Sequence, residues 1–182
     1  SQIKAANSID NGRISKEILT VTIKQKRKDD LIVNKDEHPR KTDLEKLSKL
    51  STPFKNDGSV TAGNSSGVND GAAALIIASE DAIKKNNLKP IARIVNAASS
   101  GVEPRIMGMG PVSATEKVLK KSNMKLNQID TVEINEAFAA QVLACTRELG
   151  IQDDDPRINP NGGAIAYGHP LGMSGTRLVL SA

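Results

Sequence analysis

The sequence predicts an α/β fold in which helices cover a mixed, largely parallel sheet. From Ala72 onward, apolar and β-branched runs alternate with amphipathic segments of helical length. The 182 residues include only two Phe, one Tyr and no Trp, so the core is built from smaller aliphatic side chains that suit helices packed closely on a sheet. A hydrophobic content of 38% with 25% charged residues lies within the globular range.

The second part of the chain carries the alternating pattern. Capping residues and strand-like composition mark its elements. The predicted strands are Ala72–Ala78, Ile91–Ala97, Ile129–Ile134 and Gly163–Ala166, and the predicted helices are Ser79–Asn86, Ser113–Ser122, Glu136–Leu149 and a segment from Ser174 onward.

The first part of the chain reads differently. Gln2–Ile9 has the spacing of a helix end, stopped by Asn11-Gly12. Ile18–Ile23 and Leu31–Val33 are strand-like and flank a charged tip. Asp43–Leu50 is a short amphipathic helix with Thr42 as its expected cap, and the Gly- and Ser-rich stretch that follows it fits no regular element. We therefore expect one unit at 1–70 and another at 71–182.

Charge and composition narrow the function classes. The formal charge of +4 and pI near 9.2 favour a solvated lysine-rich surface over a specific anion site. The basic run Lys24–Lys28 is not interleaved with aromatic residues, so a nucleic-acid partner is disfavoured. No apolar run has the length of a membrane span. The single cysteine, Cys145, excludes a disulfide framework and a CxxC metal site, and no metal is expected.

A stretch dense in glycine and proline surrounds one of the two histidines. His169 lies in the middle of Asn159–Gly175 (NPNGGAIAYGHPLGMSG), between Gly168 and Pro170. Such density fixes a tight loop and lets backbone approach a ligand. A histidine held in this way suits general acid–base work or oxyanion stabilisation. The alternative is a histidine in a turn that only caps a backbone carbonyl. This alternative is disfavoured because His169 lies within the whole pattern of Asn159–Gly175.

Asn135 stands where a predicted strand, Ile129–Ile134, feeds the following helix. Sites in α/β proteins gather at such strand ends, where helix amides favour negative charge. Asn135 offers an amide donor there. The plainer alternative is that Asn135 is the N-cap of that helix.

Two further segments are candidate ligand contacts. Thr61–Gly71 (TAGNSSGVNDG) has small residues along which a linear ligand could lie, with Ser66 as a donor; a solvated linker is the alternative. Met107 lies among glycines in MGMGP, which indicates a flexible apolar wall or ordinary packing.

Together these four motifs resemble the thiolase family over essentially the whole chain. The segments that carry the resemblance are NEAFAAQ, NPNGGAIA with GHPLG and SG, TAGN with NDGAAA, and MG with GP. The resemblance implies a layered α/β fold with a loop domain inserted in its first half. Residues 1–70 would be the end of that loop domain, and 71–182 most of the second half. The segments DEHPR and GVEPRIMG look most similar to bacterial 3-oxoadipyl-CoA thiolases.

The resemblance also implies residue roles. His169 would activate a cysteine nucleophile, and Asn135 would position a water in an oxyanion hole. Coenzyme A would be a substrate, with no permanently bound cofactor, and CoA thioesters would be the partners, with a homo-oligomer in the full-length protein. The implied substrate and CoA contacts are Ser66, Phe54, Ala62, Ala137, Phe138, Met107 and Arg40.

This sequence departs from the family pattern in its cysteines. Neither catalytic cysteine is present, and Cys145 reads as a small buried hydrophobe in a helix. We therefore expect a fragment that is inactive alone, prone to associate through exposed apolar surface. The alternative is a short CoA-binding module without chemistry. A bacterial cytoplasmic location is expected; because the chain begins without methionine, organellar targeting stays open.

Overall fold

The computed structural model describes all residues, 1–182. Seven α-helices, three short 3₁₀ helices and two strands follow one another along the chain. In order they are α1 (Gln2–Asp10), η1 (Ile14–Lys16), β1 (Val21–Ile23), β2 (Leu31–Val33), α2 (Leu44–Ser48), α3 (Glu80–Asn86), η2 (Pro104–Met109), α4 (Gly110–Ser122), η3 (Leu126–Gln128), α5 (Ala139–Glu148), α6 (Ala164–Tyr167) and α7 (Ser174–Ser181).

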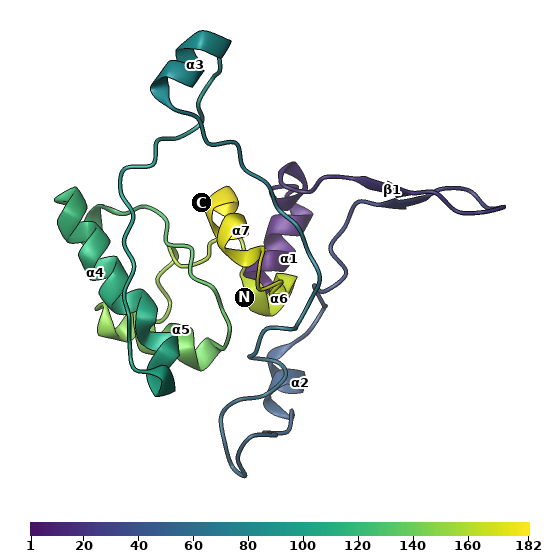
Figure 1. Ribbon diagram of the computed structural model, residues 1–182. Helices are drawn as coiled ribbons and strands as arrows, with labels where there is room; N and C mark the ends of the chain where they lie inside the picture. Colours follow the sequence, from purple (N-terminus) through teal and green to yellow (C-terminus); the bar gives the residue numbers. More distant parts are fainter.

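Two groups of helices form the body of the molecule (Figure 1). In one group α1 packs on α6, with α7 beside them, so the first and last helices of the chain lie together. In the other group α4 packs on α5, and η2 contacts both. Irregular segments connect the two groups, giving helices in layers around extended chain together with a small antiparallel sheet.

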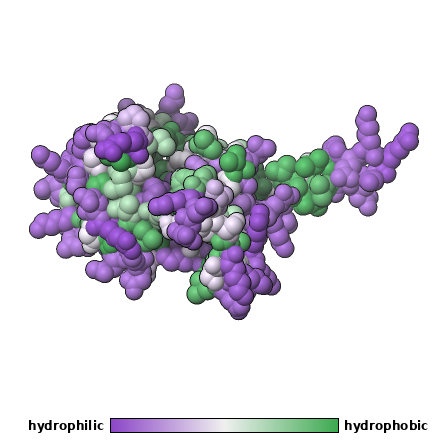
Figure 2. Space-filling view, turned by 90° about the horizontal axis from the view of Figure 1, so that it is seen from below, coloured by the Kyte–Doolittle hydropathy of each residue, from purple (hydrophilic) through white to green (hydrophobic).

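An arm of two antiparallel strands projects from the body. Val21 pairs with Val33, and Ile23 pairs with Leu31. The strands confirm the predicted hairpin, although β1 begins three residues later than Ile18. Figure 2 shows a hydrophobic band along this arm followed by a hydrophilic tip, which corresponds to the charged residues between the strands. The arm therefore keeps its charges in water at the far end.

The strands predicted after Ala72 do not form a hydrogen-bonded sheet. Ala72–Ala78 and Ile91–Ala97 have no regular secondary structure, and neither is bonded to a second extended segment. Ile129–Ile134 makes a single parallel bridge, Val132 to Ile158. The reason is physical: branched apolar residues favour extended backbone, but a strand also needs a neighbour about 4.8 Å away along its length. Figure 1 shows α3 set apart at the end of two such long segments.

The fourth predicted strand is wrong. Gly163–Ala166 falls on α6, a single helical turn whose N-cap is Gly163. The run of small residues was ambiguous because short apolar stretches do not separate strand from buried helix. Its residues Ala164, Ile165 and Ala166 are all buried.

Helix boundaries follow capping chemistry, with corrections at three starts. Asp43, not Thr42, caps α2 by accepting from the Lys46 amide. Helix α4 begins at Gly110 with Pro111 in its first turn, so Ser113 lies inside the helix and donates to Ser100 instead of capping. Helix α5 begins at Ala139, three residues after Glu136. Ser79 caps α3 as predicted, accepting from Ala82.

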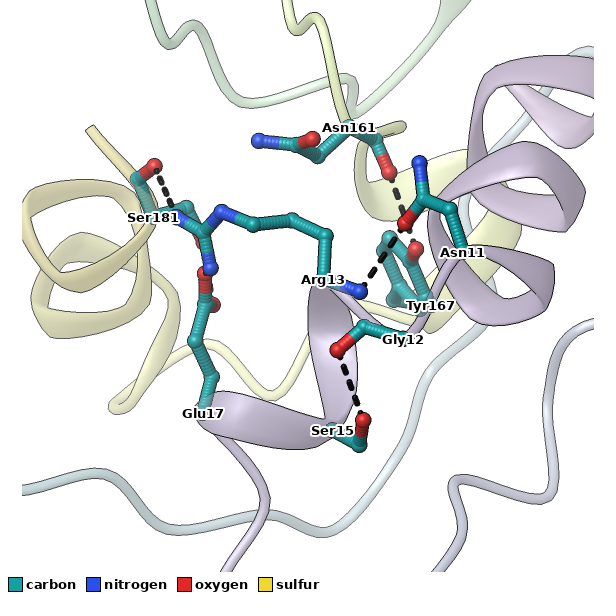
Figure 3. A network of polar contacts seen from close by, with 8 residues as sticks. All are labelled: Asn11, Gly12, Arg13, Ser15, Glu17, Asn161, Tyr167 and Ser181. Atoms are coloured by element: carbon teal, nitrogen blue, oxygen red, sulfur yellow. Dashed lines mark hydrogen bonds and ion pairs between the residues drawn. The ribbon is translucent and has the colours of Figure 1, made fainter.

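A polar network ties the beginning of the chain to the helices near its end (Figure 3). Arg13 forms an ion pair with Glu17 and donates to the carbonyl of Ser181, 3.2 Å away. The Ser181 hydroxyl donates to Glu17 at 2.9 Å. The Tyr167 hydroxyl donates to the carbonyl of Asn161 at 2.8 Å. The Arg13 and Glu17 contacts hold the end of α7 against η1, and the Tyr167 contact holds the end of α6 to the loop before it.

The buried core is small and lies mostly in the last third of the chain. Of 182 residues, 19 are buried, so much apolar surface stays exposed to solvent. The exposed aliphatic side chains of the irregular segments include Val68, Ile76, Ile77, Ile91, Ile94 and Val95. None of the helices has both the length and the apolar character needed to cross a membrane.

Candidate active site

His169 and Asn135 come together although they are far apart in sequence. The Nδ2 atom of Asn135 lies 3.3 Å from Nε2 of His169. Asn135 follows the extended segment 129–134, and His169 follows α6 after Gly168. Both side chains are partly buried, so the pair sits at the surface of the packed core and not on a free loop.

The other ring nitrogen of His169 is held by Ser174, the first residue of α7. Their Nδ1 and Oγ atoms are 2.6 Å apart. The Ser174 hydroxyl also donates to the carbonyl of Pro170 at 2.9 Å. A hydroxyl has one proton and a carbonyl only accepts, so the hydroxyl oxygen must accept from Nδ1–H. This sets the tautomer of neutral His169: Nε2 carries the free lone pair and accepts from Asn135.

The backbone of His169 is also fixed, by the polar loop before Gly71. Its N–H donates to the carbonyl of Gly67 and to Oδ1 of Asn69, both at 3.2 Å. Gly168 has a φ of 92°, and a Cβ built there would collide with Oδ1 of Asn69. Only glycine fits this turn without strain, because L-residues avoid positive φ.

The same polar loop is bonded to the segment after Asn135. The amide and the hydroxyl of Ser66 both donate to the carbonyl of Ala137, at 3.0 and 3.2 Å. Ser65 forms an isolated antiparallel bridge with Phe138. The structure thus places three predicted contact residues, Ser66, Ala137 and Phe138, in one bonded unit with the segments of Asn135 and His169. Since the Ser66 hydroxyl already donates to Ala137, its remaining capacity is to accept.

The remaining predicted contact residues lie outside this bonded unit. Phe54 and Met107 are each 77% exposed, Phe54 in the loop after α2 and Met107 in η2. Ala62 and Arg40 are also exposed. Phe54 lines a shallow pocket with Lys55, Asp57, Gly58, Ser59 and Val60. These four residues are exposed and share no hydrogen bond with the unit.

Asn135 is not a helix cap. The N-cap of α5 is Phe138, and no side chain caps it. Oδ1 of Asn135 is buried and has no hydrogen-bond partner, while Nδ2 is turned toward His169. A buried carbonyl oxygen of this kind is able to accept from a water molecule or another donor in the site.

A carboxylate lies two residues before Asn135. Burial raises the pKa of Glu133 to about 7, and the nearby Glu17 and Glu136 add to the rise, while Arg177 and Arg13 oppose it. Both carboxylate oxygens are buried without hydrogen-bond partners. Burial therefore disfavours the ionised form of this side chain.

Cys145 belongs to the packing, as predicted. Its thiol is fully buried on α5 and donates to the carbonyl of Gly108 at 3.1 Å. Burial raises the pKa of the thiol. Both features oppose a thiolate, so Cys145 has the environment of a structural cysteine.

The sequence patterns missed Ser174 and Asn69 as site residues, although both lie inside the glycine-rich motifs already singled out. The available signal was the spacing of five residues between His169 and Ser174, which places the first residue of the next helix against the imidazole ring. For Asn69 no local signal existed, since its partner is 100 residues away.

With this geometry in place, comparison with known proteins assigns the family. The model of the thiolase C-terminal domain matches residues 88–182, and that of the thiolase N-terminal domain matches residues 1–81. The chain belongs to the thiolase family. Two solved structures share its fold closely: the acetyl-CoA acetyltransferase of Bacillus anthracis has a TM-score of 0.94 at 46% identity, and human mitochondrial 3-ketoacyl-CoA thiolase in complex with CoA has 0.91 at 50%.

Curated relatives are similar along the whole chain. The beta-ketoadipyl-CoA thiolase of Acinetobacter baylyi is 55% identical over 183 residues, and the 3-oxoadipyl-CoA/3-oxo-5,6-dehydrosuberyl-CoA thiolase of Escherichia coli is 54% identical. All of this chain is matched but only 46% of each relative, so the chain spans about half their length. The two solved structures are likewise covered over 45% and 44% of their chains. The layered α/β fold of the family is therefore the fold of this chain.

Proposed function

We propose that this chain carries the histidine and asparagine part of a thiolase active site, which transfers acyl groups between CoA thioesters. The reaction is 3-oxoacyl-CoA plus CoA to acyl-CoA plus acetyl-CoA, or the reverse Claisen condensation. The observation that carries the proposal is the His169–Asn135 pair, with a 3.3 Å contact on Nε2 and the tautomer set from Nδ1 by Ser174.

His169 acts as the base. Its Nε2 lone pair, which faces the Asn135 amide at 3.3 Å, takes the proton of a cysteine thiol supplied by sequence outside these 182 residues. In the cleavage direction the resulting thiolate attacks the 3-oxo carbonyl, the C2–C3 bond breaks, and the acetyl-CoA enolate that leaves takes up a proton; CoA then accepts the acyl group from the cysteine. In the condensation direction the thiolate attacks the thioester carbonyl, and the CoA thiolate leaves and takes up a proton. The Nδ1–H contact to Ser174 supports the imidazolium that forms, because an acceptor already faces the proton that stays on the ring.

Asn135 acts as a neutral hydrogen-bonding group. Its amide nitrogen faces His169, and its buried oxygen has acceptor capacity for a water in the site. Such a water donates to the thioester oxygen as negative charge develops on it, which lowers the barrier to the enolate. We infer the same oxyanion role for His169 once it is protonated.

The substrate contacts proposed for the CoA chain are Ser66, Phe54, Ala62, Ala137 and Phe138, with Met107 near the acyl group and Arg40 near the nucleotide. Supporting this, Ser66, Ala137 and Phe138 adjoin the catalytic pair, and the exposed Phe54 and Met107 offer apolar surface. No permanently bound cofactor is required. The names of the relatives favour a dicarboxylic substrate of the 3-oxoadipyl-CoA type.

The wider organisation is part of the proposal. Residues 1–70 are assigned to the end of an inserted loop domain, and 71–182 to the C-terminal thiolase domain. The proposal also includes a homo-oligomer in the complete protein and a location in the bacterial cytoplasm.

The test uses a polypeptide in which this sequence is completed to the length of its relatives, with both cysteines. CoA-dependent cleavage of 3-oxoadipyl-CoA and acetoacetyl-CoA is followed by loss of the 3-oxoacyl-CoA absorbance. We expect cleavage, and a decrease of about 10²–10⁴ in kcat for His169→Ala. A completed protein that binds CoA in calorimetry without any cleavage would support a binding module instead.

A further inference from the structure

Glu136 is a buried carboxylate that joins the two segments carrying the catalytic pair. It is 8% exposed and follows Asn135 directly. One carboxylate oxygen accepts from Nδ2 of Asn159 at 3.1 Å. The other accepts from the backbone N–H of Ile165 in the first turn of α6, at 3.0 Å. The residue thus bridges the end of segment 129–134 to the helix that leads into His169.

Both partners of Glu136 are donors, and neither is free to change. Asn159 is 1% exposed, and its amide makes two bonds to the backbone of Ile134: Oδ1 accepts from the N–H at 2.8 Å, and Nδ2 donates to the carbonyl at 2.9 Å. The amide orientation is therefore fixed, with Nδ2 toward Glu136. The N–H of Ile165 is a donor by nature. Only a side chain with two acceptors, a carboxylate, satisfies both.

The space around the carboxylate is matched to it. A Cβ built on Gly163 would collide with the carboxyl group of Glu136. Asn159 adopts a positive φ of 43°, which turns its side chain toward Ile134 and Glu136. A glycine and an asparagine with positive φ thus make room for one buried carboxyl group, an arrangement that a simple packing contact does not need.

We propose that Glu136 is a positioning residue for catalysis: its carboxylate sets the distance between Asn135 and His169. This rests on the proposed function, because it concerns the same pair. Glu136 touches no reacting atom. It acts through α6, which ends at Tyr167, two residues before His169, and through its own neighbour Asn135.

Glu136→Gln in the completed protein is the principal test. Glutamine keeps the shape of the side chain but has only one acceptor atom. Its NH₂ group must therefore face either Nδ2 of Asn159 or the N–H of Ile165, and one of the two hydrogen bonds is lost. A shift of about 1 Å at a catalytic group costs about a hundredfold in rate, so we expect kcat to fall about a hundredfold. KM for CoA should stay within about twofold, because the effect is confined to the transition state. Glu136→Asp keeps both acceptors on a shorter stem and should retain an intermediate kcat.

A spectroscopic readout separates positioning from general loss of stability. The chain has two histidines, so the imidazole ¹⁵N signals of His169 are assigned with a His38→Gln variant. In Glu136→Gln the Nε2 signal should shift as the Asn135 amide moves away from it, while the Nδ1 signal, held by Ser174, should stay in place. The control is Thr146→Val on α5, which removes a buried hydroxyl bonded to the carbonyl of Leu143 at 3.2 Å. It should lower thermal stability and leave kcat and the His169 signals unchanged.

The outcomes distinguish the two proposals. If His169→Ala abolishes activity while Glu136→Gln keeps kcat within about twofold of the parent, Glu136 is no positioning residue and the proposed function stands. If His169→Ala has no effect, the proposed function itself fails. If Glu136→Gln does not fold, Glu136→Asp decides, since a parental kcat in that variant overturns the inference.

Discussion

The amide nitrogen of Asn135 lies 3.3 Å from Nε2 of His169, across 34 positions of sequence. Neither residue lies in a helix or in β1 or β2: Asn135 follows the irregular segment 129–134, and His169 follows α6. Three further residues restrain the pair. Ser174 is bonded to the His169 ring, Asn69 accepts from the backbone N–H of His169, and Glu136 bonds the segment after Asn135 to α6. A geometry with that many independent restraints is the kind that acid–base chemistry requires.

Ser174→Ala should release the histidine ring. Without its acceptor on Nδ1, neutral His169 samples both tautomers and the imidazolium loses a charge-assisted bond. A loss of about 1.4 kcal/mol corresponds to about tenfold in kcat in the completed protein. The matched control is Ser181→Ala on the same helix, whose hydroxyl is also buried but donates to Glu17. Equal kcat values for the two variants would contradict the role of Ser174.

Gly168→Ala should cost stability at the histidine loop. Its φ of 92° is strained for any L-residue, and the new Cβ collides with Asn69, so we expect a loss of about 1–3 kcal/mol in the free energy of unfolding. Gly175→Ala is the control: no atom lies within 4 Å of its Cβ position and it stands inside α7. That variant should gain about 0.5–1 kcal/mol from helix propensity. Chemical denaturation measures both.

The stability of the chain should fall between about pH 4.5 and pH 7 because of Glu133. Its pKa in the folded state is about 7, above the usual 4.5, mainly through burial. In that window the folded state binds more protons than the unfolded state, so the free energy of unfolding falls as pH rises. The free energy of unfolding does not change through Glu133 below about pH 4.5, and the loss is complete above about pH 7.

The measurement is the urea midpoint at pH 5 and pH 8. Glu133→Gln should show a smaller drop between the two values than the parent, and the exposed Glu103→Gln should show the parental drop. The pKa of Asp155 is lowered to about 2 by its hydrogen bonds with Arg157, so its stabilising contribution is lost only below the usual 3.8 and does not overlap this window. A parental drop in Glu133→Gln would disprove the assignment.

Cys145 should resist alkylation in the native state. The thiol is fully buried, bonded to the carbonyl of Gly108, and its pKa is raised by burial. We expect slow labelling by a maleimide in buffer and rapid labelling in denaturant, followed by intact mass. Cys145→Ala in the completed protein should retain parental kcat. Rapid native labelling would show that α5 opens readily.

The chain expressed by itself should associate with rising concentration. Its irregular segments expose a set of aliphatic side chains, including Ile76 at 93% and Ile94 at 65%. Exposed apolar surface of this extent drives association. Sedimentation velocity over a concentration series measures it, and Ile76→Lys with Ile94→Lys should shift the distribution toward monomer. A monomer at all concentrations in the parent chain would contradict this.

Local structure was predictable where local chemistry decides it. The Ser79 cap of α3, the stop at Asn11-Gly12 after α1, the hairpin strands and the burial of Cys145 all follow from residues close in sequence. The predictions failed where the conformation depends on contacts with distant segments. The segments at 72–78 and 91–97 have strand composition but no hydrogen-bonded partner strand. Gly163–Ala166 forms most of helix α6 and its cap, packed in the buried core.

The sequence by itself determined the family and singled out His169 and Asn135 as the candidate pair, because glycine-rich motifs with fixed spacing constrain the backbone locally and are recognisable without a fold. Only the tertiary structure decided that Asn135 faces His169, that Ser174 selects its tautomer, and that Glu136 lies between two fixed donors. These are contacts between segments separated by loops, and hydrogen-bond direction depends on which donor and acceptor the packing brings within about 3 Å of each other.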